Sequence, residues 1–149
     1  MDDRALWEAF QESRLPADRW THREHLRVAW MHLDRHPLDD AHVLMRVGII
    51  RLNAFHGLVE TTSRGYHETL TRVWLALVAK LRATSTETTS DAFVDAFAGS
   101  LSRDAVLSHY SRDRLGDHPR AHLASWSGIL SGRRLWRRWR AAIDHERST

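Results

Sequence analysis

The sequence has no cysteine and little glycine or proline. Without cysteine, none of the 149 residues can form a disulfide or act as a thiolate metal ligand. The chain has seven glycines and three prolines, a share below the usual one, which disfavours turn-rich β architectures and favours helices. Lys80 is the only lysine, so arginine carries almost all of the positive charge.

A long apolar run is also missing. The longest run, Val73 to Ala79, is far shorter than the ~20 apolar residues that a membrane-spanning helix needs. The first four residues are polar or acidic after Met1 and contain no apolar segment typical of a signal peptide. We therefore expect no membrane span and a cytoplasmic location.

The composition predicts one globular domain over residues 1–149. Hydrophobic residues make up 42% of the chain and charged residues 28%, which argues against disorder. The formal net charge is +3, but it depends on one segment with five arginines, Arg133, Arg134, Arg137, Arg138 and Arg140. Because the rest of the chain sums to −2, the basic character belongs to this segment and not to the whole domain.

Apolar residues recur with helical periodicity along the chain, and we find no repeat and no convincing strand. Thr21 and Glu24 have the spacing of a capping box, Pro37 should end the helix that begins there, and Gly57 should end the next one. The sequence predicts an all-α, single-domain bundle of about six to eight helices. The expected helices cover residues 3–13, 21–35, 39–56, 66–83, 91–98 and 102–109, a stretch from Pro119, and a basic amphipathic helix at 132–146.

Four of the eleven histidines have placements that suggest a site. His22 and His25 are three residues apart at the start of one helix and so share a face. His67 begins another helix and lies on the same apolar face as Leu70. His56 ends the helix that lies between these two helices in the sequence. If short connections join antiparallel helices, all four histidines lie at one end of the bundle. Six further histidines lack a consistent position on an apolar stripe, and we expect them on the surface: His32, His36, His42, His118, His122 and His145.

Clustered histidines predict a metal centre. Neutral imidazole is the commonest protein metal ligand, and a pair three residues apart suits one cation. Three histidines with an open position are typical of catalytic sites, whereas four are typical of closed structural ones. The expected cofactor is a divalent transition metal, with zinc or iron favoured and copper, manganese or nickel left open.

Three further residues are candidates for catalysis beside the histidines. Tyr66 and Tyr110 are candidate proton donors, although tyrosines of helical proteins more often serve packing. Glu68 is the neighbouring carboxylate, which would also stabilise a helix N-terminus by its charge. The chain has no glycine-rich phosphate loop, no GxSxG elbow and no HExxH helix.

Three segments carry the motifs T-H-x-x-H-L, Y-H-x-T-x-T and Y-S, in this order. With these motifs the chain resembles a family of small all-helical bacterial proteins of unassigned function, over roughly residues 15 to 115. The resemblance implies that the family's motif positions are Thr21, His22, His25, Tyr66, His67, Thr69, Thr71, Tyr110 and Ser111. The chain departs from the family after Leu115, where the arginine helix stands in place of an acidic, proline-containing tail.

The arginine helix suggests an alternative function. Its arginines oppose an apolar face formed by Leu135, Trp136, Trp139, Ala142 and Ile143. Arginine with tryptophan suits nucleic acid or an anionic membrane surface, although packing of the tryptophans on the bundle is the simpler interpretation.

Three hypotheses follow from the sequence. The first is a metal-dependent enzyme acting on a small molecule, with His22, His25 and His67 as ligands and His56 as a candidate fourth. The second is a non-catalytic protein that uses the arginine helix to bind nucleic acid, a membrane surface or a protein partner. The third is a structural metal or hydrogen-bond cluster of histidines without catalysis. The sequence predicts neither the reaction nor the oligomeric state.

Overall fold

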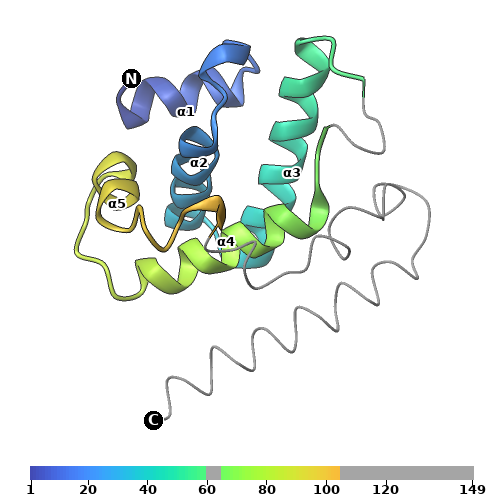
Figure 1. The fold of residues 1–149 in the computed structure, drawn as a ribbon. Coiled ribbons are helices and arrows are strands. Elements are labelled where there is room, and N and C mark those ends of the chain that lie inside the picture. Colours follow the sequence, from blue (N-terminus) through green and yellow to red (C-terminus); the bar gives the residue numbers. More distant parts are fainter. Residues whose placement is uncertain (60–64, 105–149) are drawn as a thin grey trace, which may run out of the picture.

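A computed structural model describes residues 1–59 and 65–104, and this part of the chain is all-helical (Figure 1). The predicted helical class is confirmed for these residues, while the helices expected after residue 104 lie outside them. The described elements are the α-helices α1 (Asp3–Gln11), α2 (His22–Arg35), α3 (Leu38–Phe55), α4 (Glu68–Arg82) and α5 (Ser90–Ala96), and the 3-10 helix η1 (Ala17–Arg19).

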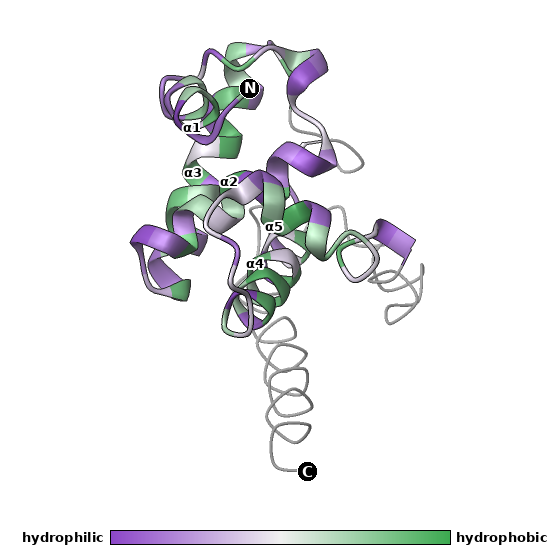
Figure 2. Ribbon diagram, turned by 90° about the vertical axis from the view of Figure 1, so that its left-hand side faces the viewer, coloured by the Kyte–Doolittle hydropathy of each residue, from purple (hydrophilic) through white to green (hydrophobic). Residues whose placement is uncertain are grey.

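Helix α2 is the centre of the fold and packs against each of the other four α-helices. Helix α4 runs across the bundle instead of parallel to α3, as Figure 1 shows. Hydrophobic and hydrophilic positions alternate along the helices (Figure 2), as amphipathic helices require. None of the helices in residues 1–59 and 65–104 combines the length and the apolar character that crossing a membrane would need.

The ends of the helices follow the predicted signals with one difference. Thr21 is the N-cap of α2, but its hydroxyl donates to the Glu24 carboxylate and does not cap a backbone N–H. The expected capping box therefore locates the start of the helix correctly and its hydrogen bonds incorrectly. Helix α2 ends before Pro37, and Gly57 follows α3 with a φ of +65°, a conformation that glycine adopts without strain.

Two histidines that we expected on the surface are buried. His32 is 1% exposed and His42 is 8% exposed, so this prediction was wrong for both. The physical reason for His32 is that α2 is buried on all sides between Leu26 and His32, so this helix has no polar face at the position of His32. The His32 ring lies 4.8 Å from the ring of Trp7, and none of the described residues hydrogen-bonds to either of its nitrogens.

A buried arginine fixes the N-terminal segment to α2 and α5. Arg27 is 3% exposed; one of its terminal nitrogens lies 2.9 Å from an Asp3 carboxylate oxygen, and its Nε donates to Ser90 Oγ at 3.0 Å. The hydrogen bonds from Ser90 and Arg27 lower the pKa of Asp3, although burial alone would raise it. This network connects α1, α2 and α5, and it includes none of the four histidines that we predicted as ligands.

Candidate functional site

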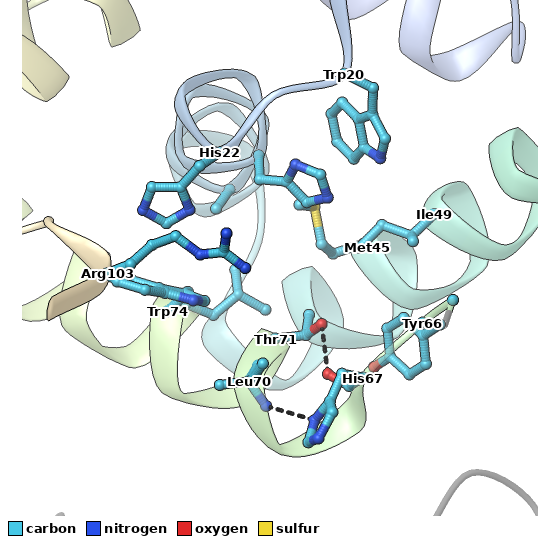
Figure 3. A pocket seen from close by; sticks show the side chains of 14 residues that line it. Trp20, His22, Met45, Ile49, Tyr66, His67, Leu70, Thr71, Trp74 and Arg103 are labelled. Atoms are coloured by element: carbon cyan, nitrogen blue, oxygen red, sulfur yellow. Dashed lines mark hydrogen bonds between the residues drawn. The ribbon is translucent and has the colours of Figure 1, made fainter. Parts of the chain in front are cut away.

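A pocket of about 350 Å³ forms where the first turns of α2 and α4 meet the middle of α3. Three of the four predicted ligands, His22, His25 and His67, line this pocket, which we call the histidine pocket. Figure 3 shows His22 and His67 on opposite sides of it, with Met45 and Ile49 of α3 forming part of the wall. The histidines at the starts of α2 and α4 therefore lie around one pocket, as expected from the sequence.

His22 is the first residue of α2, and a backbone carbonyl fixes its ring. Its Nε2 lies 3.0 Å from the carbonyl oxygen of Leu101. A carbonyl can only accept, so Nε2 carries the proton and Nδ1 keeps the lone pair in the neutral ring. The edge of the ring also meets the indole of Trp74, with 4.6 Å between the ring centres.

His25 is held in the same manner by the opposite nitrogen. Its Nδ1 donates to the carbonyl oxygen of Thr21 at 2.7 Å, which leaves the lone pair on Nε2. The ring stacks on Trp20 with 3.7 Å between the ring centres. Burial lowers the pKa of His25 to about 4, against the smaller opposing effects of the Thr21 carbonyl and the Glu24 charge, so the ring is neutral near pH 7.

His67 differs from the other two because it caps a helix. It is the N-cap of α4, which begins at Glu68, two residues later than predicted. Its Nδ1 accepts a hydrogen bond from the backbone N–H of Leu70 at 3.2 Å, so this lone pair serves the helix. The Thr71 hydroxyl donates to the His67 carbonyl and not to its imidazole.

The structure does not bring His56 to the other three. Its Nε2 donates to the carbonyl oxygen of Leu15 at 2.7 Å, and the residue does not line the histidine pocket. Our prediction assumed a short connection between α3 and α4, but Tyr66 Oη lies 3.4 Å from Nε2 of His42, near the start of α3. The ten residues from Gly57 to Tyr66 can extend about 30 Å, enough to return along a helix of 18 residues, which is about 27 Å long.

The histidines as placed do not form a complete metal site. Within residues 1–59 and 65–104, no three side chains of His, Cys, Asp or Glu are positioned to hold one ion. The lone pairs of His22 and His25 are the ones that local backbone hydrogen bonds leave available. A backbone carbonyl that binds the other ring nitrogen is the usual partner of a metal-ligating histidine. These two residues are therefore the best candidates for holding a metal.

Tyr66 and Glu68 form a hydrogen-bonded pair behind the pocket. Tyr66 is 4% exposed and its hydroxyl donates to Glu68 at 2.7 Å, while Glu68 also accepts from His42 at 3.1 Å and Arg72 at 2.8 Å. Burial alone would raise the pKa of Glu68, but these hydrogen bonds hold it well below its usual range. Burial and the charge of Glu68 raise the pKa of Tyr66. Near pH 7 Tyr66 therefore keeps its proton and Glu68 stays ionised, which suits positioning better than proton transfer.

A row of aromatic rings connects the pocket with the core. Trp20 lies between His25 and Phe10, with 5.1 Å between its ring centre and that of Phe10, and Phe10 lies 6.0 Å from the ring centre of His32. We call these four residues the aromatic row. A Cβ added to Gly48 would lie only 2.4 Å from the Phe10 ring, so this glycine makes room for the row.

Several residues of the site escaped the sequence analysis. Trp20, Trp74 and Arg103 line the histidine pocket, and Figure 3 shows Arg103 beside Trp74 and reaching toward the middle of the pocket. One sequence signal could have placed Trp20 near the site, namely its position directly before the predicted start of α2. Arg103 had no such signal, because it lies several residues after α5 and far in sequence from the histidines.

Several sequence predictions lie outside the described residues, namely the catalytic candidate Tyr110, the surface histidines His118, His122 and His145, and the arginine helix at 132–146. Binding of nucleic acid, membrane or protein by that helix stays a prediction. Comparisons with protein-family models, with curated proteins and with solved structures find no match to this chain.

Proposed function

We propose that the histidine pocket is the active site of a metal-dependent enzyme that acts on a small molecule, with His22 and His25 as metal ligands. The observation that supports this is the matched anchoring of the two rings. Each donates its N–H to a backbone carbonyl, of Leu101 or of Thr21, and keeps one lone pair. Carbonyl contacts of this kind orient metal-ligating histidines and fix their tautomer.

The electrostatics of His25 favour a ligand over a general base. A base works best when its pKa is near the working pH, and a pKa of about 4 makes this imidazole a weak proton acceptor at pH 7. The same low pKa keeps the ring neutral, which is the form that binds metals. His25 can therefore present its lone pair without first losing a proton.

The remaining residues of the pocket have supporting roles in this proposal. Trp20 and Trp74 hold the two rings from the side, and Tyr66 keeps a proton that its bond to Glu68 fixes in place. His67 can become a third ligand only if its ring leaves the Leu70 N–H. When bound, a divalent transition metal would polarise a carbonyl or activate water. Zinc or iron remains the favoured metal, and the same proposal includes a cytoplasmic location and further helices after residue 104.

Metal analysis of protein purified without a histidine tag tests the proposal. After incubation with zinc or iron(II) and removal of free ions, we expect about one metal per chain. His22→Ala and His25→Ala should lose the metal while circular dichroism shows the helices intact. His56→Gln is the matched control, because this histidine lies outside the pocket, and it should keep the metal.

Two results would count against the metal. If the wild-type chain takes up none of zinc, iron, copper, manganese or nickel, His22 and His25 are not metal ligands. If His22→Ala unfolds the chain and His56→Gln does not, the cluster is structural, which was the third hypothesis from the sequence.

A further inference from the structure

We infer that the histidine pocket takes a small organic anion, whose carboxylate or phosphate group lies toward Arg103 and whose apolar body lies against Trp20 and α3. This inference rests on the proposed function because it concerns the same pocket. It adds the charge and the size of the ligand, neither of which the histidines alone determine.

The side chains around the pocket carry positive charge and no negative charge. A guanidinium, three imidazoles, two indole N–H groups, a phenol and a threonine hydroxyl are its side-chain polar groups, and none of its lining residues in the described part of the chain is Asp or Glu. The nearby carboxylate Glu68 is outside the lining and already accepts three hydrogen bonds. The described lining of the pocket therefore contains no negative charge, and Glu24, whose charge acts on His25, lies outside it.

Arg103 differs from the arginines that stabilise the fold. Arg23, Arg27, Arg72 and Arg82 each pair with at least one carboxylate. No carboxylate in residues 1–59 and 65–104 forms an ion pair with Arg103, which is exposed and lines the pocket. A guanidinium binds carboxylate and phosphate through paired hydrogen bonds, so its natural complement here is an anionic group of the ligand.

Backbone dipoles of two helices add to the positive potential in the pocket. The first turns of α2 and α4, where backbone dipoles contribute further positive potential, face the same space. An anion would relieve this potential, and it would also offset the charge of a bound metal ion.

The apolar part of the pocket limits the size and the shape of the ligand. Trp20, Met45, Ile49, Leu70 and Trp74 supply flat and aliphatic surfaces. The volume of about 350 Å³ is near the lower end of the usual range for small-molecule sites. An acid with a single ring fits these limits better than a nucleotide or a polymer.

Binding of four related probes to the metal-free full chain tests the inference. Phenylacetate and phenyl phosphate are the anions, phenethyl alcohol is the neutral analogue and phenethylammonium is the cation, each titrated by calorimetry. We expect at least one anion to bind about tenfold more tightly than the alcohol, and the cation to bind most weakly. A preference between the two anions would support the inference and identify the anionic group.

Variants locate the charge that is responsible. Arg103→Gln should weaken anion binding about tenfold and leave the alcohol unchanged. Arg51→Gln is the matched control, since Arg51 is exposed on α3 and does not line the pocket, and it should change neither affinity.

The possible failures are distinguishable. Equal or tighter binding of the alcohol or the cation would overturn the inferred preference for an anion, and so would an unchanged anion affinity in Arg103→Gln. Either result would leave the pocket as a small-molecule site. Binding of none of the four probes would overturn the inference together with the small-molecule part of the proposed function. The metal analysis is separate from both, because these titrations use no metal.

Discussion

Helix α2 places two histidines, His25 and His32, in surroundings that differ in their hydrogen bonds. Both rings have a pKa lowered to about 4, and burial is the largest cause for each. His25 donates to a carbonyl and lines a pocket, whereas none of the described residues bonds to either nitrogen of His32. A lowered pKa therefore does not by itself distinguish a site from a core position. The features that distinguish the site from the core position are the tautomer of His25, which a hydrogen bond fixes, and the adjoining pocket.

The largest expected effect belongs to the core histidine and depends on pH. His32 has a pKa of about 4 in the folded chain and about 6.5 when unfolded, because burial and the charges of His36 and Arg35 disfavour its protonation. Between these values the unfolded chain binds a proton that the folded chain does not. His32 alone should thus lower the free energy of unfolding by on the order of 3 kcal/mol as the pH drops from 6.5 to 4. Urea denaturation at several pH values measures this.

His32→Leu is the control for this prediction. The variant removes one of the two histidines with a lowered pKa, so about half of the loss between pH 6.5 and pH 4 should disappear, while His25 accounts for a comparable part. At pH 7 it should be stabilised by about 1 kcal/mol, because two buried nitrogens without partners are replaced by apolar atoms. An unchanged pH dependence would show that His32 is not the group that titrates.

The next effect tests the contact between the core and the pocket. Gly48→Ala gains about 1 kcal/mol in helix propensity, but its methyl group would lie 2.4 Å from the buried ring of Phe10. Overpacking of this kind costs about 1–3 kcal/mol, so we expect a net destabilisation of about 1 kcal/mol in urea denaturation. The shift of Phe10 should also move Trp20, which a change in tryptophan fluorescence would report.

Gly99→Ala provides the comparison, because no atom of the described residues lies within 4 Å of a Cβ at this position. It should leave both the stability and the fluorescence unchanged. If Gly48→Ala behaves in the same way, the aromatic row does not connect the two surroundings.

The smallest effect on stability belongs to the pocket histidine. His25 is half-buried and its hydrogen bond goes to the preceding turn of its own helix, so His25→Gln should change the free energy of unfolding by less than about 1 kcal/mol. Metal uptake should nevertheless be lost. A destabilisation of 2 kcal/mol or more in urea denaturation would place His25 with the core residues and remove the contrast with His32.

Much of the fold could be predicted because local signals determine where the helices end. Pro37 and Gly57 fixed two of these ends to within one residue, and Thr21 fixed the start of α2. These residues act through their own backbone or through atoms a few residues away, so no knowledge of the tertiary structure is needed.

The site was predictable only in part. His22 and His25 share a helix turn, and their pairing follows from spacing alone. His56 was misplaced because the course of the chain between α3 and α4 leaves no local signal, and His32 was misjudged because its burial depends on α1 covering α2. Arg103 enters the pocket from a distant part of the sequence, where its charge has no periodic pattern.

The aromatic row has a consequence for how this chain can change over evolutionary time. Gly48 leaves space for Phe10, and the rings of Phe10 and Trp20 lie between His32 and His25. A change in side-chain size at one of these positions therefore affects the packing of the next. Substitutions among contacting residues are not additive. Among homologues, a larger residue at 48 should therefore occur together with a smaller one at 10, and lineages that change Trp20 should also have altered the chemistry at position 25.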